Sequence, residues 1–340
     1  MGPLRVAVVG HGLIGSQRAA ALHALAQSEP VTLAATVDPA PRADDLYDGV
    51  PHLERVQALD PESFDAAVVA LPHDLATPTA TSLLEQGKPV LVEKPLGLTG
   101  HEAEAIATRA EPLERPSFVG YNYRFLPHVL DLRAAIAAGK LGKLRSVDML
   151  IGHGGHPDSA ASWKLSPQRA GGGVLLDPGV HLLDLLLLLD PELAPAHVAG
   201  TRGFWGTGIE EDLVAVLEHG DLLATLRVSH IRWVNTLRIE VVGEDGYAIL
   251  EGRGGNYGPM TSRVGSRWGW HDDPQGRSQR ETETARDHGA DNRSLDDELR
   301  AVVGRWLGDG DGDGAAQPAT MAEGRRVTDR VESMYALLDA

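Results

Sequence analysis

Short apolar runs alternate with helix-like segments over the first 120 residues of the chain. Leu4–Val9, Val31–Val37 and Ala66–Leu71 are mainly apolar runs of strand length, which is typical of strands buried on both faces of a sheet. Segments with helical spacing, such as Ser16–Ala26 and Thr99–Arg109, alternate with them. This alternation predicts βαβ units, and therefore an α/β fold with a doubly wound parallel sheet.

The pattern changes after about Arg124. A helix is predicted over Pro127–Ala138, and strands of more alternating polarity follow it. These predicted strands are Leu144–Ile151, His197–Gly203, Leu213–Glu218, Leu222–Ile231, Thr236–Gly243 and Ala248–Gly252. Because turn residues such as Gly220-Asp221 separate neighbours, the strands should pair antiparallel in a second, α+β domain.

These two patterns place the domains at residues 1–124 and 125–340. The stretch Arg253–Asp291 is rich in Gly, Arg, Ser and Asp, so we expect a long loop there. Two helices, near Leu295–Leu307 and Ala322–Leu338, are predicted to close the chain, and the second can pack back on the first domain.

A glycine-rich turn follows the first predicted strand. Gly10, Gly12 and Gly15 have the spacing GxGxxG where a helix begins, which is typical of a pyrophosphate-binding turn. Asp38 ends the second strand, 23 residues after Gly15, where a carboxylate accepts hydrogen bonds from the adenosine ribose. The carboxylate repels a 2′-phosphate, so NAD is favoured; Arg42 nearby leaves NADP as the less favoured alternative.

Two further segments carry candidate catalytic groups. Lys94, in Glu93-Lys94-Pro95, follows a predicted core strand at the sheet edge where ligands bind, and could stabilise a developing alkoxide. Asp177, His181 and Asp184 follow three glycines and share one face of an apolar helix, so His181 could move a hydroxyl proton. The glycines at 171–173 would let backbone approach a ligand. A surface lysine and a core histidine are the plainer interpretations of these two segments.

Composition narrows the partners. Lys and Arg number 31 against 48 Asp and Glu, a formal charge of -17, which repels nucleic acid and anionic membranes. The chain has no cysteine and no HExxH pair among its 14 histidines, so no metal is expected. The acidic repeat Asp309–Gly314 lacks the remaining ligands of a calcium loop. With no export signal and an apolar stretch, Leu182–Leu189, too short to span a bilayer, a cytoplasmic protein is expected.

Together these segments make the chain resemble the glucose–fructose oxidoreductase / inositol dehydrogenase / rhizopine catabolism family, Gfo/Idh/MocA. The resemblance rests on Gly10–Gly15, on the run 87–96 with Glu93-Lys94-Pro95, on the run 120–125, and on Trp163 and Gly171–Asp184. It implies an N-terminal Rossmann domain and a C-terminal α+β domain with a large open, mostly antiparallel sheet. That sheet often mediates dimer or tetramer contacts in the family, so a homodimer or homotetramer is expected.

The resemblance also assigns residues to roles. Lys94, Asp177 and His181 would be catalytic, with His181 the proton acceptor during alcohol oxidation. The expected cofactor-binding residues are Gly10, Gly12, Leu13, Ile14, Gly15, Asp38, Leu71, Pro72, His73, Glu93, Lys94 and Asn122. The expected substrate-binding residues are Lys94, Tyr123, His153, His156, Trp163, Asp177 and His181. For His153 and His156, a plain loop role is an equal alternative.

Two positions depart from the family pattern near the cofactor. The family commonly has Asn where this chain has His73, and His where it has Ala76, which puts the nicotinamide-ribose contacts in doubt. The expected activity is NAD-dependent hydride transfer to or from a secondary alcohol or ketone of a sugar, aminosugar or cyclitol. The alternatives are an NADP-dependent keto-sugar reductase of a deoxysugar or aminoglycoside pathway, an NAD-dependent glycosidase, and a non-catalytic NAD-sensing regulator.

Overall fold

The computed structural model describes residues 2–41, 47–155, 163–267, 283–309 and 316–340. The chain forms two compact units. The first unit comprises Met1–Asn122, Gln168–Gly171 and Leu295–Asp329, and the second comprises Tyr123–Pro167, Gly172–Ser294 and Arg330–Ala340. These units differ from the blocks 1–124 and 125–340 expected from sequence, because the chain returns to the first unit twice after leaving it.

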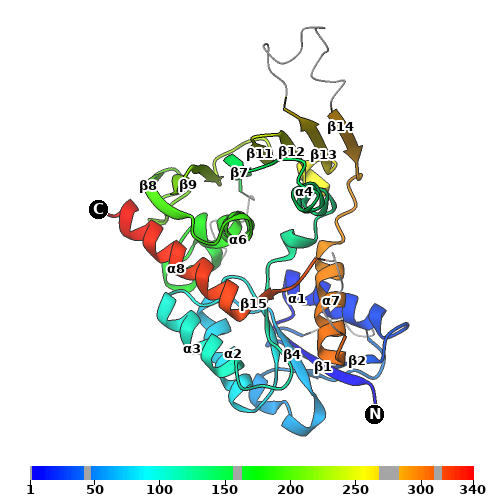
Figure 1. The fold of residues 1–340 in the computed structure, drawn as a ribbon. Coiled ribbons are helices and arrows are strands. Elements are labelled where there is room, and N and C mark those ends of the chain that lie inside the picture. The colour runs from blue at the N-terminus through cyan, green and yellow to red at the C-terminus, as the bar shows by residue number, and fades with distance from the viewer. Residues whose placement is uncertain (1, 42–46, 156–162, 268–282, 310–315) are drawn as a thin grey trace, which may run out of the picture. The chain divides into compact units, whose positions relative to one another are not determined.

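The first unit is built on a seven-stranded sheet (Figure 1). Its strands are β1 (Leu4–Val9), β2 (Val31–Val37), β3 (His52–Leu53), β4 (Ala66–Val69), β5 (Val90–Glu93), β6 (Phe118–Gly120) and β15 (Ala319–Thr320). Their order is β15-β6-β5-β4-β1-β2-β3, and every pair is parallel except β15 with β6. The strand order therefore reverses between β1 and β4, the position where nucleotides bind in such sheets. The predicted parallel sheet is confirmed.

Helices cover both faces of this sheet, as the uninterrupted apolar strands require. They are α1 (Leu13–Leu25), α2 (His73–Glu85), α3 (Gly100–Ala110) and α7 (Ser294–Leu307). Figure 1 shows α1 and α7 on one side of the sheet and α2 and α3 on the other. Leu22 of α1 and Trp306 of α7 pack in one buried cluster with Val8 and Phe118, so the returning segment completes the first unit's core.

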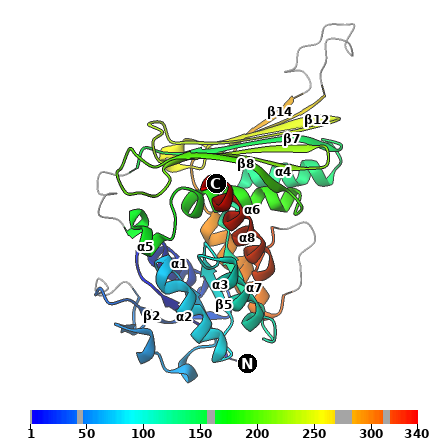
Figure 2. The same cartoon turned by 90° about the vertical axis from the view of Figure 1, so that its left-hand side faces the viewer.

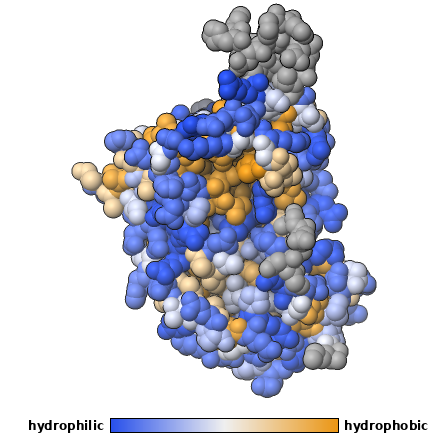
Figure 3. Space-filling model, viewed as in Figure 1, coloured by the Kyte–Doolittle hydropathy of each residue, from blue (hydrophilic) through white to orange (hydrophobic). Residues whose placement is uncertain are grey.

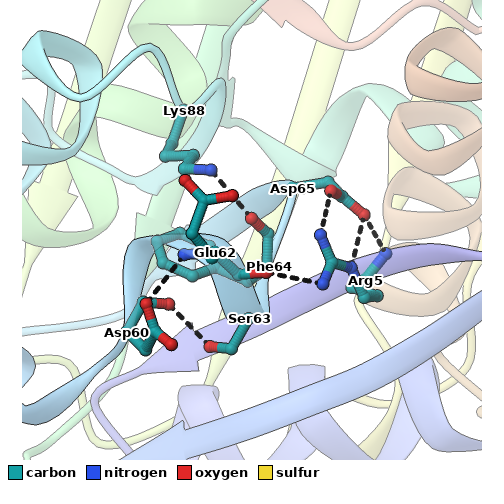
Figure 4. Close-up of polar contacts among 7 residues, drawn as sticks. All are labelled: Arg5, Asp60, Glu62, Ser63, Phe64, Asp65 and Lys88. Atoms are coloured by element: carbon teal, nitrogen blue, oxygen red, sulfur yellow. Dashed lines mark hydrogen bonds and ion pairs between the residues drawn. The ribbon is translucent and has the colours of Figure 1, made fainter.

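The amino-terminal edge of this sheet is fastened by polar contacts (Figure 4). Asp65, just before β4, accepts hydrogen bonds from the Arg5 backbone and side chain at 2.7–3.1 Å. These bonds, together with the charge of Arg5, hold the pKa of the Asp65 carboxyl below its usual value. Lys88, ahead of β5, donates to the Phe64 carbonyl at 2.9 Å. This edge is thus used for structure, and the opposite, carboxyl edge carries the candidate nucleotide residues.

The second unit is built on an eight-stranded sheet of order β14-β13-β12-β11-β7-β10-β9-β8. Its strands are β7 (Leu144–Gly152), β8 (Ala194–Thr201), β9 (Asp212–His219), β10 (Leu222–Ser229), β11 (Thr236–Gly243), β12 (Gly246–Glu251), β13 (Thr261–Ser266) and β14 (Glu283–Asp287). Only β7 and β10 pair in parallel. The predicted, mostly antiparallel sheet is confirmed.

Two helices, α4 (Pro127–Ala137) and α6 (Val180–Leu189), lie on one face of this sheet (Figure 2). Alternate residues of β7, β10 and β11 are buried, which matches a sheet covered on one side. Hydrophobic residues gather beneath the sheet where Figure 1 draws α4 and α6 (Figure 3). No helix of the described residues covers the other face, where Val214 and Leu223 are exposed.

Two expectations from sequence need correction. The stretch Arg253–Asp291 is not one long loop, because β13 and β14 lie within it and extend the sheet; residues 268–282 lie outside the described part. The apolar stretch is also longer than Leu182–Leu189: Pro167–Leu189 is long and apolar enough to cross a membrane. However, 78% of its most apolar window is buried in the structure, which is the packing of a core segment.

Candidate active site

The glycine turn occupies the carboxyl end of β1. Gly10 has φ +92°, and a Cβ there would lie 2.3 Å from the Ala70 carbonyl oxygen. A Cβ on Gly15 would lie 1.9 Å from the Gly10 oxygen, so α1 can approach the sheet only without it. A Cβ on Gly12 would meet nothing within 4 Å. Two glycines therefore serve packing, while Gly12 leaves open space at the start of a helix.

That helix start has the features of an anion site. The N-cap of α1 is Gly12, so no side chain caps the first backbone N–H groups of the helix. The first turn also contains no acidic residue. The backbone N–H groups of the first turn thus retain their partial positive charge for a pyrophosphate. Leu13 is 77% exposed and Ile14 37%, an arrangement that a bound nucleotide would cover.

Asp38 lies beside this turn, directly after β2. One carboxylate oxygen accepts the His11 N–H at 2.7 Å, and the other accepts the Ala40 N–H at 2.9 Å. The acid is thereby held at the rim of the glycine turn. Arg42, because of which NADP stayed an alternative cofactor, lies outside the described residues, as does the rest of 42–46.

Leu71-Pro72-His73 leads from β4 into α2, whose N-cap is Pro72. His73 is buried and shares a hydrogen bond of 2.9 Å between its Nδ1 and the Ala170 carbonyl, within the first unit. Ala76 is also buried. The unusual histidine thus fixes the short segment Gln168–Gly171, and its predicted contact with the cofactor stays a prediction.

Glu93 and Lys94 follow β5 at the same sheet edge. The Glu93 carboxylate accepts from the fully buried Arg18 at 2.7–2.8 Å, and Arg18 also pairs with the buried Glu298. A Cβ on Gly120 would lie 2.9 Å from the Glu93 carboxylate. This network fixes the backbone next to Lys94, which is joined to Pro95 by a cis peptide bond. Asn122 begins η3 (Asn122–Phe125), just after the neighbouring β6.

In the second unit, Asp177 lies in a wide π-helical turn, Leu175–Gly179, that leads into α6. His181 is 7% exposed, in the first turn of α6. Its ring stacks on Tyr123 with centroids 4.1 Å apart and planes 6° apart. Burial raises the pKa of Tyr123 to about 12, and the negative charge of Asp177 adds to this rise. The predicted residues Tyr123, Asp177 and His181 therefore form one cluster.

The predicted row of Asp177, His181 and Asp184 does not hold as one functional face. Asp184 is 1% exposed and accepts two hydrogen bonds from Arg124, at 2.8 and 2.6 Å. Arg124 directly follows Tyr123, and Asp184 lies one turn after His181. The pair therefore joins the two segments that carry the stacked rings, and its role is to position them.

The glycines before Asp177 also have a different role from the one expected. A Cβ on Gly173 would lie 1.9 Å from the Glu210 carbonyl oxygen, and one on Gly172 would lie 2.1 Å from the Tyr335 hydroxyl. The Glu210 carboxylate accepts N–H groups of Gly173 and Leu175 at 3.0 Å. These glycines admit protein packing rather than a ligand.

Three strands that run in the same direction, β7, β10 and β12, end at one edge of the second sheet. His153, His230 and Arg253 follow these strand ends. The rings of His153 and His230 are 4.4 Å apart, and burial is the main reason that the pKa of His153 is lowered. Arg253 donates to the Tyr123 hydroxyl at 2.8 Å. His153 is thus part of the cluster's surroundings, whereas His156 lies outside the described residues.

Trp163 begins the short helix η5 (Trp163–Leu165). The next residue, Lys164, reaches both carboxylate oxygens of Asp177 at 2.9 Å. This ion pair brings the Trp163 segment to the predicted catalytic acid. Three residues near this cluster were not predicted from sequence: Lys164, His230 and Arg253. A signal was available for Arg253, because it follows the predicted strand Ala248–Gly252, whereas His230 falls inside the predicted strand Leu222–Ile231.

The first unit therefore fits a dinucleotide, through an open glycine turn, an uncapped helix start and a carboxylate at the ribose position. Among the residues that the structure describes, no group of three His, Asp or Glu side chains could hold a metal ion.

Two protein-family models match the chain. A family model described as "Oxidoreductase family, NAD-binding Rossmann fold" matches residues 4–121, and one for the GFO/IDH/MocA C-terminal domain matches residues 129–249. The two together cover more than half of the chain.

Individual relatives are similar over different lengths. The rhizopine catabolism protein MocA of Rhizobium meliloti is 32% identical over 60% of this chain and 65% of that protein, just under two thirds of its length. An inositol 2-dehydrogenase of Mycolicibacterium smegmatis is 29% identical over 79% of this chain and 77% of that protein. Among solved structures, GenD2 from gentamicin A biosynthesis, in complex with NAD, superposes with a TM-score of 0.77 at 25% identity, over 100% of this chain and 95% of that one.

Proposed function

The chain belongs to the GFO/IDH/MocA oxidoreductase family, and we propose that it transfers a hydride between NAD and a secondary alcohol or ketone of a sugar, aminosugar or cyclitol. The similarity to MocA, to an inositol 2-dehydrogenase and to GenD2 supports this substrate class. The observation that carries the proposal is the buried stack of His181 on Tyr123, with Asp177 beside it.

The first unit would hold the cofactor, which when bound supplies the hydride acceptor or donor. The α1 N-terminus binds the pyrophosphate and the open side of Gly12 admits it. Asp38 accepts the ribose hydroxyls, and its charge disfavours the 2′-phosphate of NADP. The expected contacts from Leu71 to His73, Glu93 and Asn122 complete the cofactor residues.

The chain's own groups manage the proton. His181 accepts the hydroxyl proton during oxidation and returns it during reduction, while the Lys94 ammonium stabilises negative charge on the substrate oxygen. Asp177 orients the substrate. The ion pair between Asp177 and Lys164 would hold the neighbouring Trp163 near the same substrate. Tyr123, His153 and His156 are the remaining expected substrate contacts.

A keto-sugar reductase of an aminoglycoside pathway is the second candidate. It uses the same residues in the opposite direction, and the similarity to GenD2 from gentamicin A biosynthesis favours it. We also propose a cytoplasmic homodimer or homotetramer, in which the exposed face of the second sheet, with Val214 and Leu223, is the contact surface.

The test compares Lys94→Met with Lys88→Met. Both lysines flank β5, but Lys88 lies at the opposite, amino edge of the sheet, bound to the Phe64 carbonyl (Figure 4). With inositols, aldoses and aminoglycosides as substrates and NAD or NADP as cofactor, Lys94→Met should lower turnover roughly 100- to 1,000-fold. NADH binding should be nearly intact, and Lys88→Met should behave as wild type. Undiminished turnover of Lys94→Met would overturn the assignment.

A further inference from the structure

Arg253 is a largely buried cation that the proposed reaction does not use. It lies two residues after β12, at the sheet edge that also carries His153 and His230. Its guanidinium donates to the Tyr123 hydroxyl at 2.8 Å and lies 4.3 Å from the centroid of the Tyr257 ring. The whole group stands directly beside the Tyr123–His181 stack.

Arg253 lacks the usual partner of a buried cation. No ion pair joins it to a carboxylate in the described part of the chain, where its side chain bonds to Tyr123 and its buried Nε has no hydrogen-bond partner. Its two aromatic neighbours are neutral phenols, since burial raises the pKa of both Tyr123 and Tyr257. Neutral acceptors and ring faces hold a guanidinium in place, but they do not neutralise it.

The surrounding charges leave that cation in excess. Asp177 is the carboxylate that acts electrostatically on Arg253, but it is already bound through both oxygens to Lys164. His153 adds no positive charge at neutral pH, because burial lowers its pKa. Among the described residues, Arg253 and Lys164 therefore carry one more positive charge than Asp177 balances, in a chain whose formal charge is -17. A local excess of this sign attracts anions against the overall field.

We propose that Arg253 binds an anionic group, a carboxylate or a phosphate, on the sugar or cyclitol substrate. This inference rests on the proposed function, because it deepens the substrate class of the same cluster. A guanidinium binds either anion through parallel N–H donors, and Tyr257 and Tyr123 hold its plane in a fixed orientation. The enzyme then selects acidic substrates over neutral ones with the same ring.

The experiment measures ligand affinity rather than turnover. D-Glucuronate, glucose 6-phosphate and D-glucose are titrated by calorimetry into the NADH-bound enzyme. The carboxylate or the phosphate ligand should bind roughly 10- to 100-fold more tightly than glucose. Arg253→Gln should remove that preference and Arg253→Lys should keep part of it. Arg263→Gln, which removes a surface arginine of β13 paired with Glu251, is the matched control and should change nothing.

Tyr123→Phe separates recognition from positioning. It removes the hydroxyl that Arg253 contacts and keeps the ring that stacks on His181. If Arg253 only positions Tyr123, Tyr123→Phe and Arg253→Gln will change the affinities for all three sugars alike, and the proposal fails. It also fails if both anionic ligands bind no better than glucose, or if Arg253→Gln weakens NADH binding and leaves the sugar preference intact.

These outcomes are distinct from failure of the proposed function. Lys94→Met should retain the preference for the acidic sugar although it loses turnover. If the enzyme prefers the acidic sugar but reduces NAD with no sugar, the anion site at Arg253 is supported and the proposed hydride transfer is overturned. If the enzyme turns over sugars but shows no preference for an acidic one, the hydride transfer is supported and the anion site is overturned.

Discussion

In the first unit, the residues predicted to hold the nucleotide lie close together in the sequence, whereas in the second unit the substrate residues come from distant segments. Only one helix and one strand separate Gly15 from Asp38 in the sequence, and the His11 N–H donates directly to the Asp38 carboxylate. By contrast, the stacked rings of Tyr123 and His181 are 58 positions apart in the sequence, and Arg253 donates to Tyr123 from 130 positions away. A local motif needs only its own backbone, while a dispersed cluster needs the correct packing of the whole unit.

This difference predicts different responses to mutation. Changes in the first unit should affect nucleotide binding with limited loss of stability. Changes at the supports of the second unit should weaken stability and the substrate cluster together, and should leave nucleotide binding in place.

The largest effect is expected at the buried Arg124–Asp184 pair. Asp184→Ala leaves Arg124 buried without that carboxylate, which should cost about 3–5 kcal/mol in the free energy of unfolding. Turnover should fall as the Tyr123–His181 stack loosens, while NADH affinity persists. Denaturant unfolding and NADH titration measure the two effects. Asp221→Ala, in an exposed pair with Lys143, is the control and should leave stability unchanged. Equal losses of NADH and substrate binding would contradict the contrast.

The next effect distinguishes two glycines of one turn. Gly15→Ala places a Cβ 1.9 Å from the Gly10 oxygen, so α1 must shift, which should cost about 1–3 kcal/mol of stability as well as NADH affinity. Gly12→Ala meets no protein atom within 4 Å, so it should preserve stability and lose NADH affinity alone. Thermal unfolding and NADH fluorescence separate the two variants. A Gly12→Ala variant that binds NADH normally would show that the pyrophosphate does not use this space.

The same contrast explains what sequence could predict. The parallel sheet, its glycine turn and Asp38 follow from local periodicity and spacing, and the structure places them accordingly. The positioning role of Asp184 did not follow, because helical spacing places it on the face of His181 without revealing that Arg124, 60 positions away, binds it. Likewise, the glycines at 172 and 173 gave no sign of Glu210 and Tyr335, their packing partners.

Arg253 was missed for a different reason. Its surroundings are rich in Gly and polar residues, which are typical of loops, yet β13 and β14 continue the sheet beyond it. Strands near a sheet margin bury fewer residues, so their apolar signal is weak; β14 is exposed at four of its five residues. The position of Arg253 after a strand end was the usable signal.

A smaller effect is expected for cofactor choice at Asp38. Asp38→Ala removes the acceptor of two backbone N–H groups and the charge that opposes a 2′-phosphate. The ratio of NADH to NADPH affinity should fall roughly 10- to 100-fold. NADH loses the hydrogen bonds between its ribose and a charged carboxylate, and NADPH no longer meets repulsion between that carboxylate and its 2′-phosphate. Titration with both nucleotides gives the ratio. An unchanged ratio would place the specificity elsewhere.

The smallest effect concerns acid stability of the second unit. The carboxylate of Asp131, on α4, accepts a hydrogen bond from the Ser262 hydroxyl of β13 at 2.5 Å. It also bonds to Arg286 within β14 at 2.5 Å and to His288, the residue after β14, at 2.8 Å. Burial alone would raise the pKa of the Asp131 carboxyl, but these hydrogen bonds and the charges of Arg286 and His288 outweigh it, so the pKa is lowered. A lowered folded pKa means that the stabilisation is complete above the unfolded value, about 3.9.

That stabilisation is lost as the pH falls through the lowered pKa, because the folded carboxylate must then be protonated. Asp131→Asn should therefore cost about 1–2 kcal/mol at neutral pH, and its difference from wild type should shrink below about pH 4. Denaturant unfolding across this pH range measures the difference. The NADH affinity of the variant at neutral pH should equal that of wild type, since Asp131 and the side chains that bind it all lie in the second unit. A stability difference that stays constant through the acid range would show that packing of α4 against β13, rather than the charge of Asp131, joins these elements.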